Sequence, residues 1–439
     1  MDESAGTGPD TNRSPEGPGV GDLIADLEAR NLIHDSTDRD ALRAQVASGP
    51  VGIYYGCDPT ADSLHVGNLI GLIVLRRFQD AGHRPIALAG GATGMIGDPG
   101  GRSEERNLLD QATLDHNVAC IKEQLGRVVE LGDGKGELVD NRDWTEGMTV
   151  LEFLRDVGKH ATVNQMLGRE SIKLRINSEH GISFTEFSYM LLQANDYLWL
   201  HDHFGCVIQI GGSDQWGNII SGVDFIRRKR GEHVHAFSWP LLTGSDGTKL
   251  GKSTGARVWL DADKTSPYQF WQHWMQTPDD VIGAQLLTFS LRPIEEINAI
   301  VEAHEQAPEK RLAQRSLADE MVTLVHGAPA AVAASEAAGL LFGADPALAS
   351  EAALETLARE IPFSKIRLEE LDDVIGVFVT TGLAKSKSDA RRTLEQGAFY
   401  ANGVRLSEKG QLRGQKLLHG RYLMLRKGKK SHHLVETIS

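Results

Sequence analysis

The chain has 439 residues, of which 24% are charged and 41% hydrophobic, and its mean hydropathy is −0.27. This length predicts about three domains, and the composition is typical of soluble globular proteins. No run of about 18 apolar residues occurs, which excludes a membrane-spanning helix. Cys57, Cys120 and Cys206 form no CxxC pair, and the N-terminus lacks a basic and apolar leader. We therefore expect no zinc ribbon, no disulfide framework, no secretory signal and a cytoplasmic location.

The net charge of −14 hides an asymmetry along the chain. Residues 381–439 hold 13 Lys and Arg against 4 Asp and Glu, a net charge of +9, which leaves −23 for the other 380 residues. A basic C-terminal module on an acidic body predicts a polyanionic partner for that module. On charge alone, a solvated basic tail is an equally good interpretation.

The N-terminal half has the pattern of a parallel α/β domain. Residues 1–20 are rich in Gly, Pro and Ser without apolar periodicity, which predicts a disordered tail. Apolar periodicity predicts helices over 21–30 and 64–81 and buried strands over 51–56, 85–89 and 206–210. Strand, helix and strand in this order, with glycines after several strands, are typical of sheets that bind ligands at their carboxyl edge. We expect a doubly wound, Rossmann-like catalytic domain over residues 21–245.

The C-terminal half has a different pattern. Residues 246–345 predict a mobile lysine loop followed by an α-helical domain, and 346–369 read as a linker rich in Ala, Glu and Pro. Residues 370–439 predict a small α+β domain with a helix over 386–396. Two short strands there flank Asn402-Gly403, a strong hairpin signal.

A first polar cluster lies at the start of the predicted helix 64–81. Asp62 or Ser63 is expected to cap this helix, whose first turn carries His65 and Asn68 on one face. A helix N-terminus offers free N–H groups and partial positive charge, so phosphate is its natural ligand. Taken alone, however, a histidine at a helix start is more often structural.

A second cluster carries two lysines. Gly251-Lys252-Ser253 suggests a P-loop, but Asp246 stands where that motif needs its first glycine. What remains is a loop with Lys249 and Lys252 three residues apart, suited to a mobile clamp on a polyphosphate. Without further context, a solvated turn is the simpler interpretation.

The predicted helix after Phe184 carries a polar face. Tyr189, Gln193 and Asp196 are spaced four and three residues apart among apolar neighbours. Three polar groups in such a helix need partners. A bound ligand and a buried internal network are equally good explanations.

The two clusters together resemble the H-I-G-H and K-M-S-K-S signatures of class I aminoacyl-tRNA synthetases, with Asn68 in place of the second histidine. Longer motifs are similar to those of bacterial tyrosyl-tRNA synthetases, namely YYGCDPTADSLH (54–65), GGATGMIGDP (90–99), FTEFSYM (184–190) and GGSDQWGN (211–218). The resemblance extends from about Gly21 to the end of the chain and includes an S4-like RNA-binding domain.

This resemblance implies activation of L-tyrosine by ATP and transfer of tyrosine to the 3′-terminal adenosine of tRNA(Tyr). The implied tyrosine-binding residues are Tyr54, Asp98, Tyr189, Gln193, Asp196 and Gln215. The implied ATP-binding residues are Gly56, Asp58, Thr60, His65, Asn68, Arg102, Arg106, Gly212, Asp214, Lys249 and Lys252. Catalytic roles fall on His65, Asn68, Lys249, Lys252 and Ser253, and RNA contacts on Lys385, Lys387, Arg391, Arg392 and Arg405.

The resemblance also implies Mg²⁺ accompanying ATP without a dedicated metal site, and a homodimer with Phe184 at its interface. Two rival functions remain open. A tryptophanyl-tRNA synthetase should not pair Tyr54 with Asp196. An RNA-binding protein with an inactive synthetase body would not need the two lysines and the complete polar face. A nucleotidyltransferase of another kind could share His65 and Asn68, but not the S4-like tail.

Overall fold

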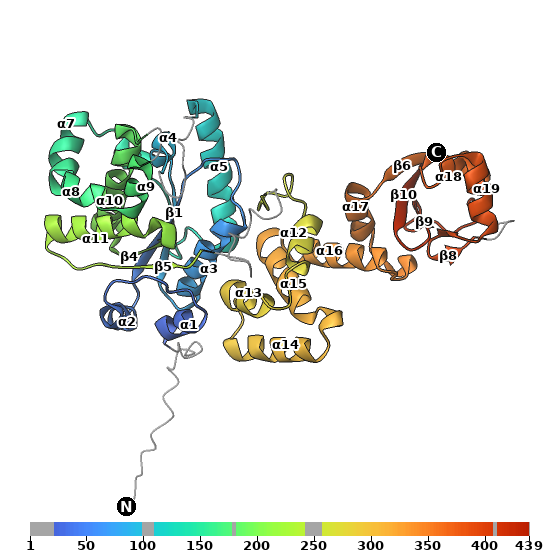
Figure 1. The fold of residues 1–439 in the computed structure, drawn as a ribbon, viewed down its shortest axis with the longest axis horizontal. Helices are drawn as coiled ribbons and strands as arrows, with labels where there is room; N and C mark the ends of the chain where they lie inside the picture. Colours follow the sequence, from blue (N-terminus) through green and yellow to red (C-terminus); the bar gives the residue numbers. More distant parts are fainter. Residues whose placement is uncertain (1–21, 99–108, 178–180, 242–256, 407–410, 439) are drawn as a thin grey trace, which may run out of the picture. The chain divides into compact units, whose positions relative to one another are not determined.

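The computed structural model of the chain describes residues 22–98, 109–177, 181–241, 257–406 and 411–438, and the predicted tail over 1–20 lies outside this range. The chain divides into two compact units, 1–250 and 251–439, whose elements are labelled in Figure 1. Unit 1 is built on a five-stranded parallel sheet of order β3-β2-β1-β4-β5. Its strands are β1 (Gly52–Cys57), β2 (Arg84–Ala89), β3 (Glu137–Asp140), β4 (Cys206–Gly212) and β5 (His235–Trp239). The predicted doubly wound parallel sheet is confirmed.

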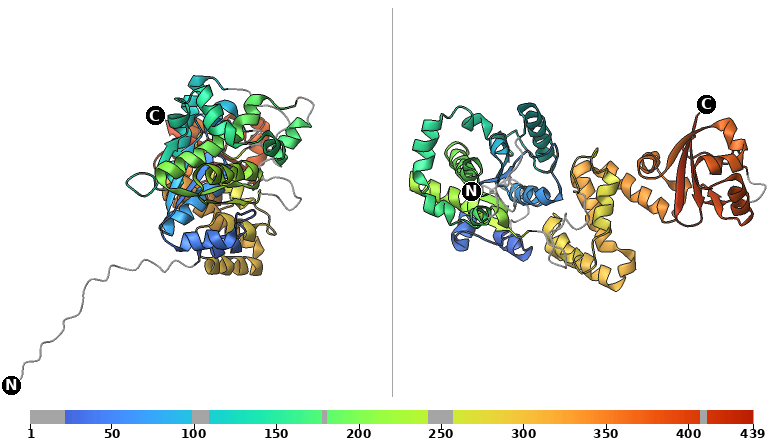
Figure 2. Two further views of the ribbon diagram at one scale, coloured as in Figure 1. Left: turned by 90° about the vertical axis from the view of Figure 1, so that its left-hand side faces the viewer. Right: turned by 45° about the horizontal axis from the view of Figure 1, so that its top comes forward.

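Helices cover both faces of this sheet (Figure 2). On one face α3 (Val66–Asp80) contacts β1, β2 and α5 (Gln111–Val128). On the other face α10 (Phe184–Phe204) and α11 (Trp216–Arg230) pack against each other and against β4. Both faces of a parallel sheet are buried in this way, which explains why its strands read as continuous apolar runs.

The described part of unit 1 also contains smaller elements. They are α1 (Leu23–Ala29), α2 (Arg39–Ala47), α4 (Thr93–Ile96), α6 (Arg142–Thr145), α7 (Val150–Glu152), η1 (Phe153–Val157), η2 (Gly158–His160), α8 (Val163–Leu167), α9 (Glu170–Ile176) and η3 (Ser213–Gln215). The predicted helix over 21–30 is therefore present as α1. In the described parts of the chain, no helix is both long and apolar enough to cross a membrane.

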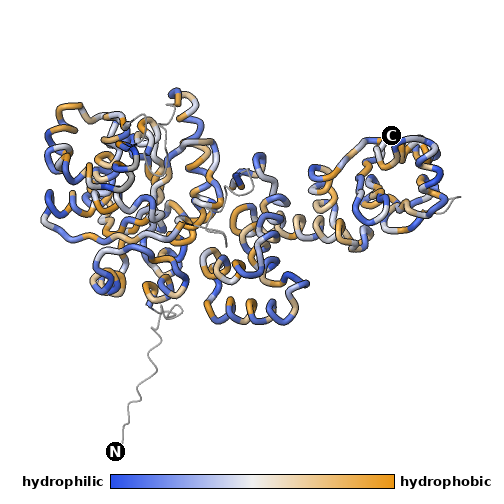
Figure 3. The backbone as a smooth tube through the Cα atoms, viewed as in Figure 1, coloured by the Kyte–Doolittle hydropathy of each residue, from blue (hydrophilic) through white to orange (hydrophobic). Residues whose placement is uncertain are grey.

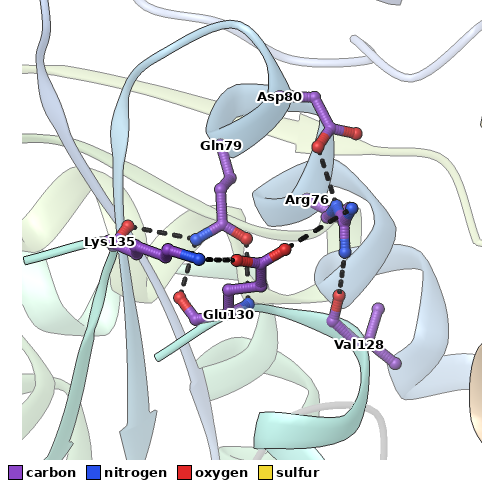
Figure 4. A network of polar contacts seen from close by, with 6 residues as sticks. All are labelled: Arg76, Gln79, Asp80, Val128, Glu130 and Lys135. Carbon is purple, nitrogen blue, oxygen red and sulfur yellow. Dashed lines mark hydrogen bonds and ion pairs between the residues drawn. The ribbon is translucent and has the colours of Figure 1, made fainter. Parts of the chain in front are cut away.

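A polar network fastens the C-terminal end of α3 to the segment between α5 and β3 (Figure 4). The Gln79 amide donates to the Glu130 and Lys135 carbonyls at 2.7 and 3.0 Å and accepts from the Glu130 N–H at 2.9 Å. Arg76 pairs with Asp80 at 2.8 Å. This network lies at the end of α3 opposite to His65, so it holds the helix whose first turn carries that residue.

Unit 2 begins with a helical layer. Its helices are α12 (Pro267–Met275), α13 (Ile282–Phe289), α14 (Ile294–Gln306), η4 (Pro308–Lys310), α15 (Leu312–His326) and α16 (Ala328–Leu341). Along α14, hydrophilic and hydrophobic residues recur at short intervals (Figure 3). This pattern is expected for a helix with one buried face. The predicted helical segment is thus present.

The segment 346–369, predicted to be a linker, is structured. It contains η5 (Pro346–Leu348), α17 (Glu351–Glu360) and β6 (Phe363–Arg367). Leu354 and Leu357 of α17 are fully buried in a cluster shared with α16 and the C-terminal sheet. The linker prediction is wrong, because a short alanine-rich helix and a strand that pairs with a partner some 70 residues later give weak local signals.

The C-terminal sheet has the order β6-β10-β9-β7-β8. Besides β6, its strands are β7 (Phe399–Ala401), β8 (Val404–Arg405), β9 (Tyr422–Lys427) and β10 (Ser431–Ile438). The helices η6 (Leu368–Asp372), α18 (Val374–Thr380) and α19 (Lys387–Glu395) lie between β6 and β7 in the sequence. β6 pairs with β10 in parallel, whereas the remaining pairs are antiparallel. Asn402 and Gly403 join β7 to β8 with φ values of 46° and 82°, which confirms the predicted hairpin.

Candidate active site

The polar motifs of unit 1 gather at the carboxyl edge of the parallel sheet. Asp58 follows β1, Asn141 follows β3, and Asp214 follows β4. The strand order reverses between β1 and β4, and ligands of open α/β sheets bind at this switch point. The sheet therefore brings together residues that lie more than 150 positions apart in the sequence.

Asp196 lies buried at the centre of this edge, with 3% of its surface exposed. The Asn141 amide donates to one of its oxygens at 3.0 Å, and the Trp144 indole N–H donates to the other at 2.8 Å. Burial raises the pKa of this carboxyl from 3.8 to about 7, while the two donors pull the pKa down. The two donors thus fix the position of the Asp196 carboxyl, and its pKa of about 7 means that its protonation changes near neutral pH.

Three polar atoms on β1, α10 and β4 are buried without a hydrogen-bond partner among the described residues: the Tyr54 hydroxyl and the side-chain oxygens of Gln193 and Gln209. Tyr54 and Gln209 are paired neighbours on β1 and β4, and Gln193 lies one helical turn before Asp196. Burial, and then the charge of Asp196, raise the pKa of the Tyr54 hydroxyl well above 10. Buried polar groups are normally paired, so this cluster points to a ligand with complementary donors and acceptors.

Asp58 is held by a second set of contacts. It accepts from the Tyr189 hydroxyl at 2.8 Å and from the Thr93 hydroxyl at 2.7 Å. A Cβ atom at Gly90 would clash with both the Asp58 oxygen and the Thr93 hydroxyl, so a side chain at this position would push this pair apart. Tyr189 therefore joins the polar face of α10 to the carboxylate that follows β1.

Asp98, 6% exposed, forms a third group with residues from η3 and α11. It accepts from the Gln215 amide at 2.5 Å and from the Asn218 amide at 3.2 Å, and Asn218 also donates to Gln215 at 3.1 Å. Asp98, Asp58 and Asp196 all raise the pKa of the Tyr189 hydroxyl, after burial. The negative charges of Asp58, Asp98 and Asp196 all act on the Tyr189 hydroxyl. A cationic group would be stabilised in this negative environment.

His65 is itself the N-cap of α3. Its Nδ1 accepts the Gly67 N–H at 3.0 Å, and the Asn68 side chain accepts the His65 N–H at 3.1 Å. The expectation that Asp62 or Ser63 caps this helix is wrong, because Ser63 instead bonds to Gln124 at 3.2 Å. His65 and Asn68 still share the first turn, as their spacing predicts.

The remaining predicted ATP residues are partly placed. Gly56 is the exposed residue of β1, Thr60 is exposed three residues after β1 ends, and Gly212 ends β4 two residues before Asp214. Arg102, Arg106, Lys249, Lys252 and Ser253 lie outside the described residues. No group of three or more His, Cys, Asp or Glu side chains suited to hold a metal occurs within the described ranges.

The five predicted RNA-binding residues lie on the C-terminal domain with exposed side chains. Lys387, Arg391 and Arg392 belong to α19, and Lys385 immediately precedes it. Arg392 pairs with Asp389 at 3.0 Å. Arg405 donates to the Gln396 and Gly397 carbonyls at the end of α19, so its side chain closes this helix.

Sequence reasoning missed several residues that shape the site: Thr93, Asn141, Trp144, Gln209 and Asn218. Two signals were available. Gln209 is a lone amide in an apolar strand, and Asn218 ends a motif already noticed, one turn after Gln215. Asn141 and Trp144 follow β3, a four-residue strand too short to recognise from its pattern.

Two family models match this chain. The family model described as tRNA synthetases class I (W and Y) matches residues 47–343, and the one described as Tyrosine--tRNA ligase SYY-like C-terminal domain matches residues 353–435. The tyrosine--tRNA ligase of Opitutus terrae is 46% identical over 95% of this chain and all of its own length. The chain belongs to the tyrosine–tRNA ligase family. The member from Mycobacterium leprae is 47% identical over 93% of this chain and 97% of its own length.

Solved structures of tyrosine–tRNA ligases have the same fold. A C-terminally truncated mitochondrial tyrosyl-tRNA synthetase of Aspergillus nidulans is 35% identical, covers 73% of this chain and 94% of its own, and has a TM-score of 0.67. A tryptophanyl-tRNA synthetase of Plasmodium falciparum is 15% identical over 70% of this chain and 86% of its own, with a TM-score of 0.53. Fold alone therefore does not separate the tyrosine enzymes from the tryptophan enzymes.

Proposed function

We propose that the chain activates L-tyrosine with ATP, forming tyrosyl-adenylate and pyrophosphate, and then transfers tyrosine to the 3′-terminal adenosine of tRNA(Tyr). The observation that carries this proposal is a buried Tyr54 hydroxyl, without a hydrogen-bond partner among the described residues, in the electrostatic field of the buried Asp196 carboxylate. A phenol hydroxyl donates to the Asp196 carboxylate and accepts from Tyr54. Phenylalanine would leave the Tyr54 hydroxyl unpaired and would leave Asp196 with only its donors Asn141 and Trp144, and an indole N–H can donate but cannot accept.

The other buried groups hold the tyrosine backbone. Asp98, Tyr189 and Gln193 surround the α-ammonium, and Gln215 lies near the α-carboxylate. This assignment uses the carboxylates that bear on Tyr189 and the unpaired oxygen of Gln193. A cation among carboxylates and amide oxygens is paired on every side.

ATP lies along the carboxyl edge of β1 and β4. Asp58, Asp214, Gly56 and Gly212 contact the adenosine, and carboxylates accept from ribose hydroxyls. The triphosphate and the leaving pyrophosphate are bound by Thr60, His65, Asn68, Arg102, Arg106, Lys249, Lys252 and Ser253. Mg²⁺ arrives with ATP as part of that substrate.

The reaction needs no activated serine or cysteine, because the substrate carboxylate is already a nucleophile. One of its oxygens attacks the α-phosphorus, and pyrophosphate leaves. In the second step a ribose hydroxyl of the tRNA terminus attacks the tyrosyl carbonyl carbon, and AMP leaves. Catalysis rests on orientation of the reactants and on donors that face the charge building on phosphate oxygens.

The basic C-terminal domain anchors the tRNA. Lys385, Lys387, Arg391 and Arg392 are exposed around the start of α19, as phosphate contacts require. Arg405 contributes positive charge beside them while its guanidinium closes α19. Cys57, Cys120 and Cys206 form no disulfide, which supports a reducing, cytoplasmic location, where tRNA is charged.

The chain acts as a homodimer in this proposal. Several large apolar side chains of α7, η1, α8, α9 and α10 are exposed: Val150, Leu151, Leu154, Val163, Leu167, Ile176 and Phe184. Phe184 is 73% exposed at the first position of α10. Exposed apolar residues gathered on consecutive elements mark a protein interface. Phe184→Asp should therefore halve the mass measured by sedimentation equilibrium.

Pyrophosphate exchange with ATP in the presence of each of the twenty amino acids tests the activation step. Tyrosine should support exchange, and phenylalanine and tryptophan should not. Exchange with tryptophan alone would establish the tryptophan enzyme instead. If no amino acid supports exchange while tRNA still binds, the chain is an RNA-binding protein with an inactive body.

A further inference from the structure

A stack of three rings runs beside the Asp196 carboxylate. Asp196, Trp199 and His203 occupy positions i, i+3 and i+7 of α10, so they share one face of that helix. Trp144 of α6 crosses this face and stacks on Trp199, with ring centroids 4.1 Å apart and planes 12° apart. His203 stacks on Trp199 at 4.1 Å and 15°.

Trp199 is the middle layer of this stack. Two rings cannot both lie flat on one face of the same indole without overlapping, so Trp144 and His203 lie on opposite faces of Trp199. The His203 ring is oriented by a hydrogen bond of 2.8 Å between its Nδ1 and the Trp199 carbonyl. His203, the outer ring of the stack, is exposed to solvent. Trp144, the inner ring, contacts the buried Asp196 carboxylate.

The inner ring needs this support because its own helix is short. Trp144 lies on α6, which is only four residues long. Its indole N–H nevertheless donates to Asp196 at 2.8 Å. A short helix by itself leaves an indole free to turn, and a ring stacked on a long, buried helix fixes that orientation.

We propose that Trp199 is a positioning residue for tyrosine specificity: it holds the Trp144 indole so that its N–H stays on Asp196. Trp199 touches no substrate in this role. The proposal rests on the proposed function, because it requires that Asp196 accepts the substrate phenol.

Kinetics of pyrophosphate exchange on Trp199→Leu test the proposal. The tyrosine KM should rise about three- to tenfold, which is what loss of one aromatic stack is worth. The ATP KM should stay unchanged, and the preference for tyrosine over phenylalanine should fall by the same factor. Trp199→Phe keeps a flat ring and should restore most of both losses.

The pH profile supplies a readout that a purely structural role would not move. With the Trp144 donor loosened, Asp196 is harder to ionise, so the midpoint of kcat/KM for tyrosine should move to higher pH in Trp199→Leu. Trp271→Leu is the matched control, since it removes a buried indole of unit 2 whose N–H donates to Asp319 at 2.7 Å. It should leave the tyrosine KM and the midpoint at their original values.

An unchanged tyrosine KM and an unchanged preference in Trp199→Leu would overturn the proposal. The proposal would also be overturned if Trp199→Leu lowered kcat only in proportion to the fraction of enzyme molecules that are active, with no change in the tyrosine KM. If Trp199→Leu does not fold, His203→Ala removes only the exposed outer ring and should raise the tyrosine KM about twofold, a weaker share of the same stacking. No change there would be equally decisive. Failure of the original chain to exchange pyrophosphate with tyrosine would instead overturn the proposed function.

Discussion

The described residues form two five-stranded sheets that expose their polar groups in opposite ways. The parallel sheet of unit 1 directs its polar groups into a buried edge, where Tyr54, Asp98 and Asp196 all lie almost fully shielded from bulk solvent. The C-terminal sheet and α19 leave Lys387 and Arg391 in solvent. A small substrate is recognised by groups that are costly to leave unpaired, whereas a polyanion is recognised by many exposed charges, each worth little. Substitutions in the buried edge of unit 1 should therefore alter the recognition of one amino acid over another. Substitutions in the C-terminal domain should weaken tRNA binding in small steps that depend on salt.

The largest effect should come from removing the C-terminal domain. The cut belongs after Ala344, because β6 pairs with β10 and α17 packs against the C-terminal sheet. Charging of tRNA should fall at least a hundredfold, because most phosphate contacts are lost. Pyrophosphate exchange with tyrosine should stay within about threefold of the intact chain, because every residue assigned to tyrosine and ATP lies before the cut. Both activities are measured on one preparation. Survival of tRNA charging would show that this domain is not the tRNA anchor.

The next effect is a dependence of activity on pH. The pKa of Asp196, raised by burial to about 7, means that acid protonates the acceptor of the substrate phenol. The value of kcat/KM for tyrosine should fall about tenfold per pH unit below about pH 7. Asp196→Asn should be weakly active and flat over this range. A flat profile in the original chain would exclude Asp196 as the acceptor.

Stability should respond to the same group with the opposite sign. The folded pKa of Asp196 lies above its unfolded value of 3.8, so its contribution is present below about pH 4 and is lost as pH rises toward 7. Asp196→Asn should remove that loss. The difference in urea midpoint between the two chains, measured at pH 4.5 and 7.5 without tyrosine, checks this sign.

A smaller and more specific effect is expected from Tyr54→Phe. The change removes one neutral hydrogen bond, worth roughly 0.5–1.5 kcal/mol. The ratio of kcat/KM for tyrosine and phenylalanine should fall by about two- to tenfold, as that energy implies. Tyr197→Phe is a matched control, because its hydroxyl donates to the His235 carbonyl at 2.7 Å beside Tyr54. The control should lower stability and leave the ratio unchanged.

The smallest effect should come from one surface charge. Arg391→Ala should lower the slope of log Kd for tRNA against log salt by about one. Tyrosine activation should not change. Glu395→Ala, on the same helix and also exposed, should leave the slope unchanged or raise it slightly. Equal losses in tRNA binding and in tyrosine activation for Arg391→Ala would remove the distinction between the two regions.

Local patterns predicted much of the fold. Apolar runs located β1, β2 and β4, and helical periodicity located α3, α10 and the helices of unit 2. Asn402-Gly403 predicted its hairpin, because positive φ at both positions is a property of those two residues themselves. Local pattern does not reveal the strand in segment 346–369, because β6 is stabilised by β10, a strand far away in the sequence.

The sequence by itself determined which residues lie on one face of an element, since helical and strand periods depend only on local backbone geometry. It therefore placed Tyr189, Gln193 and Asp196 together on α10 and His65 with Asn68 on α3. Only the tertiary structure decided that Asn141 and Trp144 donate to Asp196, that Tyr189 reaches Asp58, and that Trp199 supports Trp144. These contacts join separate strands and helices, and their geometry follows from how the whole sheet and its helices pack rather than from any local pattern.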